Sequence, residues 1–174
     1  MASMPNKQVI FVCKGNIHRS VIAEYITRKL ICDRRISGVL VKSRGLQWYM
    51  TYPPSGRNLM DYKQALDGSR TALEEQGIDV SDHVARPLSL QDMERAKLVL
   101  VMDRELLRSH RMSVLHLFPE YESKTRLFTE LVGEQSDIED CGEHSSETSY
   151  KKTIEQIARI LRDGLPQLMA WLDL

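Results

Sequence analysis

The chain has 174 residues, of which 42% are hydrophobic and 28% are charged, which suits one hydrophobic core and is too short for two domains of ordinary size. Its 24 basic residues balance its 24 acidic residues, so no overall field attracts it to nucleic acid or to an anionic membrane. No apolar run is long enough to span a bilayer and the first residues lack a signal-peptide core, so we expect a cytoplasmic protein with one domain over residues 1–174.

Strand-like and helix-like segments alternate along the chain, which is the pattern of an α/β domain with a parallel sheet. The predicted strands cover residues 9–12, 39–42, 97–102 and 114–118, and the predicted helices cover residues 19–32, 63–76, 89–96, 104–111 and 147–172. Gly77 should end the second helix, and Pro166 should kink or split the last one. Ser89 should be the N-cap of the helix at 89–96, with Asp92 three residues on. Residues 44–62 are rich in turn formers and should form a loop after the second strand, where binding sites are often built.

Residues 8–24 combine a buried strand, a tight loop and the start of a helix. The run 9–12 is β-branched and aromatic, whereas apolar residues recur at helical spacing from 21 to 30. Backbone N–H groups of a short loop that leads into a helix converge on one point, where the helix dipole favours an anion. Arg19 adds a planar set of charged donors, and the same positive field favours the thiolate form of Cys13. The segment therefore predicts an oxyanion site that contains a nucleophile.

Cys13 also has a simpler interpretation, as a small hydrophobic residue that ends a buried strand. That interpretation leaves the polar residues after it unexplained, because they have no role in a hydrophobic core; they are Lys14, Gly15, Asn16, His18, Arg19 and Ser20. The three cysteines of the chain have no metal-ligand spacing, so we expect neither a metal site nor a cofactor.

Residues 11–20 resemble the signature loop of the low-molecular-weight protein tyrosine phosphatases. Four further fragments are similar to segments of that family and occur in the same order, namely residues 43–45, 85–88, 98–103 and 137–140. The resemblance implies an α/β fold, a single-domain three-layer sandwich with a central four-stranded parallel sheet and a phosphate-binding loop after the first strand. It also implies hydrolysis of phosphomonoesters through a cysteinyl-phosphate intermediate.

Within this resemblance, Cys13 corresponds to the nucleophile, Arg19 to the phosphate clamp and Asp140 to the general acid. The phosphate-binding loop would be completed by Lys14, Gly15, Asn16, Ile17, His18 and Ser20. The hydroxyl of Ser20 should contact the Cys13 sulfur, although a helix N-cap is an alternative role. Asn16 suits a backbone position with positive φ, and its side chain can form hydrogen bonds that hold the loop.

Asp140 is the candidate proton donor for the leaving oxygen. In the family the acid precedes a proline and then aromatic residues, whereas this chain has Cys141 and then residues 142–143, Gly and Glu. The alternative is a solvated acidic surface over residues 137–143, with Asp137 as the second candidate acid. Asp103 should either orient a partner near the loop or cap the helix that follows it.

His18 departs from the family pattern, because many members have at this position a second cysteine that forms a disulfide with the nucleophile under oxidation. We therefore predict that Cys13 has no neighbouring resolving thiol. The histidine itself is interpreted as a solvated loop residue.

Substrate preference depends on three positions in the resemblance. Ile17 matches the isoleucine of phosphotyrosine-directed relatives, whereas phosphoarginine-directed relatives carry threonine there. Trp48 and Tyr49 should form part of a substrate pocket in which a ring stacks on a phenyl phosphate, or else pack in the core. The expected partner is a phosphotyrosine-containing protein or a small aryl phosphate.

Three other functions remain open on the same scaffold. An arsenate reductase would need further cysteines to relay a disulfide, and the chain offers Cys32 on the first helix and Cys141 after the acid. A phosphoarginine phosphatase is the second alternative. The third is a protein that binds a phosphorylated ligand with weak or no turnover. The oligomeric state stays open.

Overall fold

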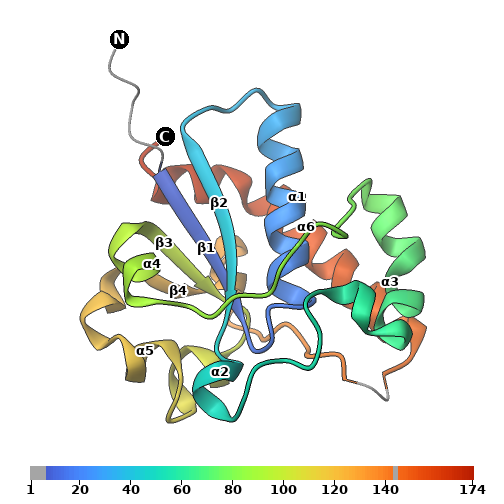
Figure 1. The fold of residues 1–174 in the computed structure, drawn as a ribbon. Coiled ribbons are helices and arrows are strands. Elements are labelled where there is room, and N and C mark those ends of the chain that lie inside the picture. The colour runs from blue at the N-terminus through green and yellow to red at the C-terminus, as the bar shows by residue number, and fades with distance from the viewer. Residues whose placement is uncertain (1–6, 143–144) are drawn as a thin grey trace.

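The computed structural model describes residues 7–142 and 145–174 (Figure 1). One sheet contains four strands, which are all parallel and follow the order β2-β1-β3-β4. The strands are β1 (Lys7–Cys13), β2 (Val39–Gly45), β3 (Ala96–Val101) and β4 (Thr125–Leu127). This sheet is the predicted four-stranded parallel sheet, and helices cover both of its faces.

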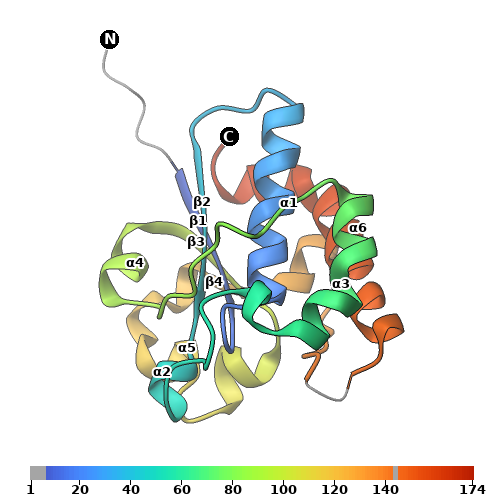
Figure 2. The same cartoon turned by 45° about the vertical axis from the view of Figure 1, so that its right-hand side comes forward.

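The helices divide between the two faces of the sheet. They are α1 (Arg19–Asp33), α2 (Gln47–Met50), α3 (Lys63–Gln76), α4 (Leu90–Arg95), α5 (Val114–Leu117) and α6 (Glu147–Trp171), with short turns η1 (Leu59–Asp61), η2 (Glu105–Ser109), η3 (Pro119–Lys124) and η4 (Phe128–Val132). Figure 2 shows α1, α3 and α6 on one face, and α4 and α5 on the other. Within the described part of the chain, no helix combines the length and apolarity needed to cross a membrane.

Strand β1 is central and is buried on both faces. Val9 and Phe11 pack in the hydrophobic cluster under α1 and α6, whereas Ile10 and Val12 pack in the cluster on the opposite face. A strand with two buried faces has a continuous apolar run instead of an alternating one. This explains why residues 9–12 contain no polar side chain.

The predicted strand at 114–118 is wrong. This segment forms α5, in which the Phe118 amide donates to the Val114 carbonyl at 2.8 Å, and the edge strand is β4. Val114 and Phe118 are the buried residues of the segment, which is the spacing of a helical turn. Short apolar runs do not distinguish a turn of helix from a strand, and the three-residue β4 carries little signal of its own.

Two helix predictions are confirmed and two need correction. Gly77 ends α3 in the left-handed conformation, and Ser89 caps α4 with Asp92 in a reciprocal capping box. The helix predicted at 104–111 is limited to the π-turn η2. The predicted split of the last helix is wrong, because α6 continues through Pro166 as one helix whose apolar stripe is buried in the core.

The topology places the carboxyl ends of β1, β2 and β3 together. The strand order reverses between β1 and β3, because the connection from β1 leads to β2 on one side and the next strand, β3, lies on the other side of β1. Ligands of open α/β sheets bind outside the carboxyl ends of the strands at such a point. Cys13 is the last residue of β1 and pairs with Gly45, the last residue of β2. The Met102 amide after β3 donates to the Val12 carbonyl at 3.0 Å. The loop after Cys13 therefore begins at the position expected for a ligand site.

Candidate active site

Cys13 has a sulfur atom that receives two polar contacts although only 3% of the residue is exposed. The Asn16 amide donates to Sγ at 3.3 Å, and Ser20 Oγ lies 3.0 Å from Sγ. Donors of this kind stabilise a thiolate. The predicted contact of Ser20 with the sulfur is therefore confirmed. The capping alternative is wrong, because α1 begins at Arg19 and its N-cap position is His18.

Arg19 is buried, and its guanidinium is held by three acceptors. Nη1 donates to Asp103 Oδ2 at 2.6 Å and to the Ile138 carbonyl at 2.8 Å, and Nη2 lies 3.2 Å from Asp140 Oδ1. Burial would lower the pKa of Arg19, but Asp140, Cys13 and Asp103 together raise it above its ordinary value. Nε has no hydrogen-bond partner among the residues that the structure describes, so one charged N–H remains for a ligand.

The acidic residues near the loop occupy different environments. Asp103 contacts Arg19 through Oδ2, as one of its two expected roles requires. Its Oδ1 accepts a hydrogen bond from the Leu106 amide at 2.8 Å, although the N-cap position of η2 is Arg104 and not Asp103. Asp137 forms an ion pair with Arg104 at 2.9 Å, and hydrogen bonds from Arg104 lower the pKa of its carboxyl. Asp140 lines the cavity above Cys13, and Asp137 does not.

A cavity of about 780 Å³ opens above the loop. The sequence-predicted residues that line it are Cys13, Lys14, Gly15, Ile17, His18, Arg19 and Asp140. The residues that sequence reasoning did not find include Tyr52 and Pro54 from the loop after α2, and Tyr62, the N-cap residue of α3. Asn16 and Ser20 are fully buried and support the loop from behind.

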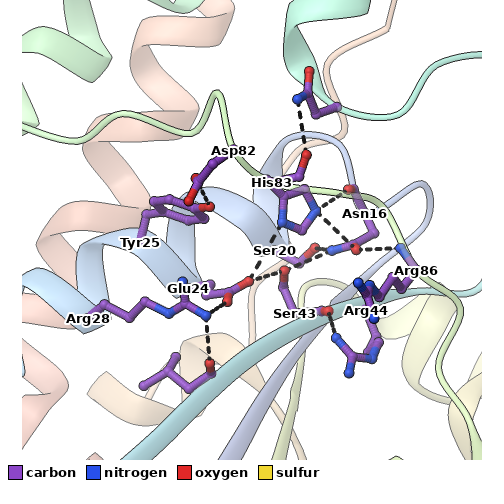
Figure 3. Close-up of polar contacts among 12 residues, drawn as sticks. Asn16, Ser20, Glu24, Tyr25, Arg28, Ser43, Arg44, Asp82, His83 and Arg86 are labelled. Atoms are coloured by element: carbon purple, nitrogen blue, oxygen red, sulfur yellow. Dashed lines mark hydrogen bonds and ion pairs between the residues drawn. The ribbon is translucent and has the colours of Figure 1, made fainter.

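Asn16 has the predicted positive φ, 54°, and its side chain joins four segments (Figure 3). Nδ2 donates to Ser20 Oγ at 3.0 Å and to Ser43 Oγ at 2.9 Å, while Oδ1 accepts from the Arg86 amide at 3.0 Å. His83 Nε2 lies 3.0 Å from the Asn16 carbonyl. The amide thus connects the loop to β2 and to residues 83–86, which holds the loop as expected.

The same network continues to Glu24, which the sequence did not identify (Figure 3). Ser43 Oγ donates to Glu24 Oε2 at 2.5 Å, Arg28 pairs with the same carboxylate, and His83 Nδ1 lies 4.0 Å from it. Burial lowers the pKa of His83, although the Asn16 carbonyl and Glu24 act in the opposite direction. The available signal was a carboxylate within the apolar stretch 21–26, since a buried acid needs partners.

The interpretation of His18 as a solvated residue is wrong. The loop turns this side chain inward, where Nε2 lies 2.9 Å from Ser69 Oγ of α3 and the ring packs edge-on against Tyr150 of α6 at 5.4 Å. Nδ1 is buried and has no hydrogen-bond partner in residues 7–142 and 145–174. Burial, assisted by the charge of Arg19, lowers the pKa of His18 to about 3.

The structure does not bring Trp48 and Tyr49 into the cavity. Tyr49 donates its hydroxyl to the Leu88 carbonyl, and its ring packs edge-on against Phe118 at 6.4 Å. The Trp48 ring lies so close to Gly45 that a Cβ there would be 2.8 Å from it. These contacts correspond to the packing alternative, because the helical turn α2 directs Tyr49 back to the core. The tyrosines that line the cavity are Tyr52, Tyr62 and Tyr150.

The other two cysteines differ in their relation to Cys13. Cys32 is exposed near the end of α1, roughly 20 Å from Arg19 at the 1.5 Å rise of a helix. Cys141 lines the cavity, and its Sγ lies 3.4 Å from Thr153 Oγ1. Burial raises the pKa of the Cys141 thiol, and Glu139 and Asp140 act in the same direction. Cys32 is therefore too distant from Cys13 to take part in a disulfide relay. The chain thus lacks one of the cysteines that an arsenate reductase would need.

Burial of neutral His18 predicts a loss of stability in acid. The folded protein protonates this imidazole only near pH 3, whereas the unfolded chain does so near pH 6.5, so the unfolding free energy decreases as pH falls through this range. Between pH 7 and pH 5 the loss should be about 2 kcal/mol. Urea unfolding of His18→Gln at the two pH values should show a smaller loss than wild type by about this amount.

The matched control is His116→Gln, because His116 is exposed and the variant should follow wild type. Equal pH dependence of wild type and His18→Gln would show that His18 is not a source of the acid sensitivity.

Comparison with known proteins places this geometry in a family. The family model of low molecular weight phosphotyrosine protein phosphatases matches residues 8–173. A low molecular weight protein-tyrosine-phosphatase of Bacillus subtilis is 29% identical over 164 residues, which cover 93% of each chain. A protein-arginine-phosphatase of the same organism is 32% identical over 161 residues, which cover 92% of this chain and 95% of the relative. The solved low molecular weight protein tyrosine phosphatase of T. tengcongensis superposes with a TM-score of 0.75 and 30% identity, covering 92% of this chain and 99% of that one. The chain therefore belongs to the low molecular weight phosphotyrosine protein phosphatase family.

Proposed function

We propose that this protein is a phosphomonoester hydrolase that acts on phosphotyrosine through a phosphocysteine intermediate on Cys13. One observation carries the proposal: the Cys13 sulfur and the Arg19 guanidinium line the same cavity. The sulfur already receives the Asn16 amide and the Ser20 hydroxyl, and Arg19 retains an unpaired Nε. A nucleophile and a charged clamp in one concave site support phosphoryl transfer more than passive binding.

In the first step, Cys13 Sγ attacks phosphorus while the loop amides and Arg19 bind the non-bridging oxygens. The S–P bond forms, the P–O bond to the leaving group breaks, and the proton of Asp140 moves to the departing oxygen. In the second step, water attacks phosphorus, the Asp140 carboxylate takes the proton of this water, and the S–P bond breaks. Ser20 and the Asn16 amide stabilise the departing thiolate, and inorganic phosphate is released.

The ion pair between Asp140 and Arg19 explains how substrate binding would free Asp140 to act as the acid. Asp140 Oδ1 lies 3.2 Å from Arg19 Nη2, and the Asp140 side chain is 57% exposed at the mouth of the cavity. A phosphate dianion bound by Arg19 competes with the carboxylate for the guanidinium. Substrate binding then directs Asp140 to the leaving group.

Phosphotyrosine is the proposed substrate because Tyr52, Tyr62 and Tyr150 line the cavity and Ile17 forms part of its wall. Aromatic rings favour edge-on or offset contacts with a phenyl group. Phosphoarginine is a second candidate, since the protein-arginine-phosphatase of Bacillus subtilis is 32% identical to this chain. We also propose that the protein acts in the cytoplasm, where Cys13, Cys32 and Cys141, all free, would stay reduced.

Replacement of the nucleophile should separate binding from turnover. Cys13→Ser should still bind phosphate or vanadate. It should release p-nitrophenol from p-nitrophenyl phosphate at a rate that is lower than that of wild type by roughly a thousandfold or more. Stopped-flow kinetics of wild type should show a burst equal to the enzyme concentration if breakdown of the intermediate is slow. The control is Cys32→Ser, whose exposed thiol lies far from the cavity and which should keep full activity. Turnover by Cys13→Ser at the wild-type rate would contradict the proposal.

Replacement of the acid should change the pH profile of kcat/KM. A reaction that needs one ionised thiolate and one protonated acid gives a bell, and Asp140→Asn should remove its alkaline limb and lower the maximum by about 100-fold. Asp137→Asn is the control, because Asp137 pairs with Arg104 outside the cavity. If the alkaline limb disappears in Asp137→Asn and remains in Asp140→Asn, the acid has been assigned to the wrong residue.

Initial rates on two peptides should decide between the two substrate candidates. The peptides share one sequence and carry either phosphotyrosine or phosphoarginine. We expect kcat/KM to be at least about tenfold higher for phosphotyrosine, since a hydrophobic contact in the pocket contributes on this scale. Ile17→Thr should reduce the ratio by opening the wall near the leaving group. A higher rate on phosphoarginine would replace the primary candidate with the second.

A further inference from the structure

The segment that carries Asp140 is attached to the rest of the fold on both sides of the acid, and the first attachment, through Ile138, lies next to the sheet. The Ile138 amide donates to the Met102 carbonyl after β3 at 2.9 Å, and the Ile138 carbonyl accepts from Arg19 Nη1 at 2.8 Å. Ile138 is also fully buried in the main hydrophobic cluster. These contacts fix the chain on the N-terminal side of the acid.

The second attachment is on α6 and lies on the C-terminal side of the acid. The Tyr150 hydroxyl donates to the Gly142 carbonyl at 3.0 Å, and Thr153 Oγ1 lies 3.4 Å from Cys141 Sγ. Tyr150 and Thr153 are three positions apart and therefore share one face of the helix. Both are 2% exposed, so this face is part of the packed interior.

The Tyr150 ring also contacts the phosphate-binding loop. It packs edge-on against His18 at 5.4 Å, and it lies directly over Gly68 of α3, where a Cβ would be 2.5 Å from Tyr150 Cδ2. Gly68 thus leaves the space that this ring occupies. One side chain joins α6, α3, the phosphate-binding loop and the segment after Asp140.

The residue that Tyr150 contacts, two positions after Asp140, is a glycine. Glycine has the largest backbone freedom of any residue type, and a Cβ at position 142 would meet no atom of residues 7–142 and 145–174 within 4 Å. Within its own turn, the Gly142 amide donates to Ser145 Oγ at 2.9 Å and the Gly142 carbonyl accepts from the Ser145 amide at 2.9 Å, so this turn is closed locally but these bonds do not tie it to the rest of the fold. The Tyr150 hydroxyl supplies a hydrogen bond at this residue, which lies two positions from the acid.

We propose that Tyr150 is a positioning residue for the general acid. Its hydroxyl holds the Gly142 carbonyl, and its ring sets the distance of this segment from the loop that carries Cys13. Tyr150 acts through Asp140, and this inference therefore rests on the proposed function of the site.

Tyr150→Phe tests the proposal, because it removes the hydroxyl and keeps the ring against His18 and Gly68. The readout is kcat/KM, which reports the step that breaks the P–O bond and is independent of how fast the intermediate is hydrolysed. On phenyl phosphate, whose leaving group needs a proton, kcat/KM should fall about fivefold to tenfold, the usual effect of one lost hydrogen bond. On p-nitrophenyl phosphate, whose leaving group needs little protonation, kcat/KM should fall less than about twofold. Competitive inhibition by inorganic phosphate should be unchanged, since the phosphate contacts remain.

A double-mutant cycle separates positioning from general stabilisation. In the Asp140→Asn background, Tyr150→Phe should have no further effect on kcat/KM, since the group that it positions is absent. An equal fall on both substrates, or an undiminished effect in the Asp140→Asn background, would overturn the proposal. Gly68→Ala is a second variant that displaces the ring and should produce the same dependence on the leaving group.

The control is Tyr25→Phe, which removes a hydroxyl bonded to Asp82 on the outer side of α1 and should leave both rates at the wild-type level. Thermal unfolding of each variant shows whether it is folded at the assay temperature. A wild-type protein without turnover would refute the proposed function itself. An active wild type with a Tyr150→Phe variant that matches Tyr25→Phe would refute only the positioning role.

Discussion

Arg19 carries a positive charge with 2% of its surface exposed, and removal of such a charge from water costs several kcal/mol unless it is paired. Asp103, the Ile138 carbonyl and Asp140 offset this cost. These groups come from the end of β3 and from the segment around residue 140, so the guanidinium is compensated only when α1, β3 and that segment have their native arrangement. The electrostatic requirement of one side chain therefore fixes the relative positions of the phosphate-binding loop and the candidate acid.

The positive charge near the sulfur comes from Arg19 and not from histidine. His18 and His83 both contact the loop, and burial lowers the pKa of both below the ordinary value. At neutral pH they therefore serve as neutral hydrogen-bonding groups, one toward Ser69 and one toward Asn16. Because a guanidinium and backbone amides do not titrate near neutrality, the field at the loop stays constant while the reacting groups change their protonation.

Local features of the chain allowed the fold class and the centre of the site to be predicted. The change from a strand-like to a helix-like pattern across residues 13–20 located the loop. This was possible because the strand, the loop and the start of the helix are adjacent in the sequence. The orientation of His18 and Tyr49 was not predictable, since each is set by residues distant in sequence, Ser69 and Leu88 respectively. For the same reason β4 escaped detection, because a three-residue edge strand is defined by its neighbour β3 and has no periodicity of its own.

The order of the segment after Asp140 depends on how firmly α6 is packed. A proline would restrict the chain through its own ring, whereas Cys141 and Gly142 impose no such restriction. Gly142 is bonded to Ser145 within its own turn, and contacts with Tyr150 and Thr153 attach this turn to α6. That helix buries an apolar stripe including Ile154, Ile157 and Leu161 against the sheet and α1. Tertiary packing thus replaces local covalent stiffness. The geometry of the candidate acid is consequently coupled to the stability of the hydrophobic core, so a cavity in the α6 interface would disturb the site without touching any residue that lines it.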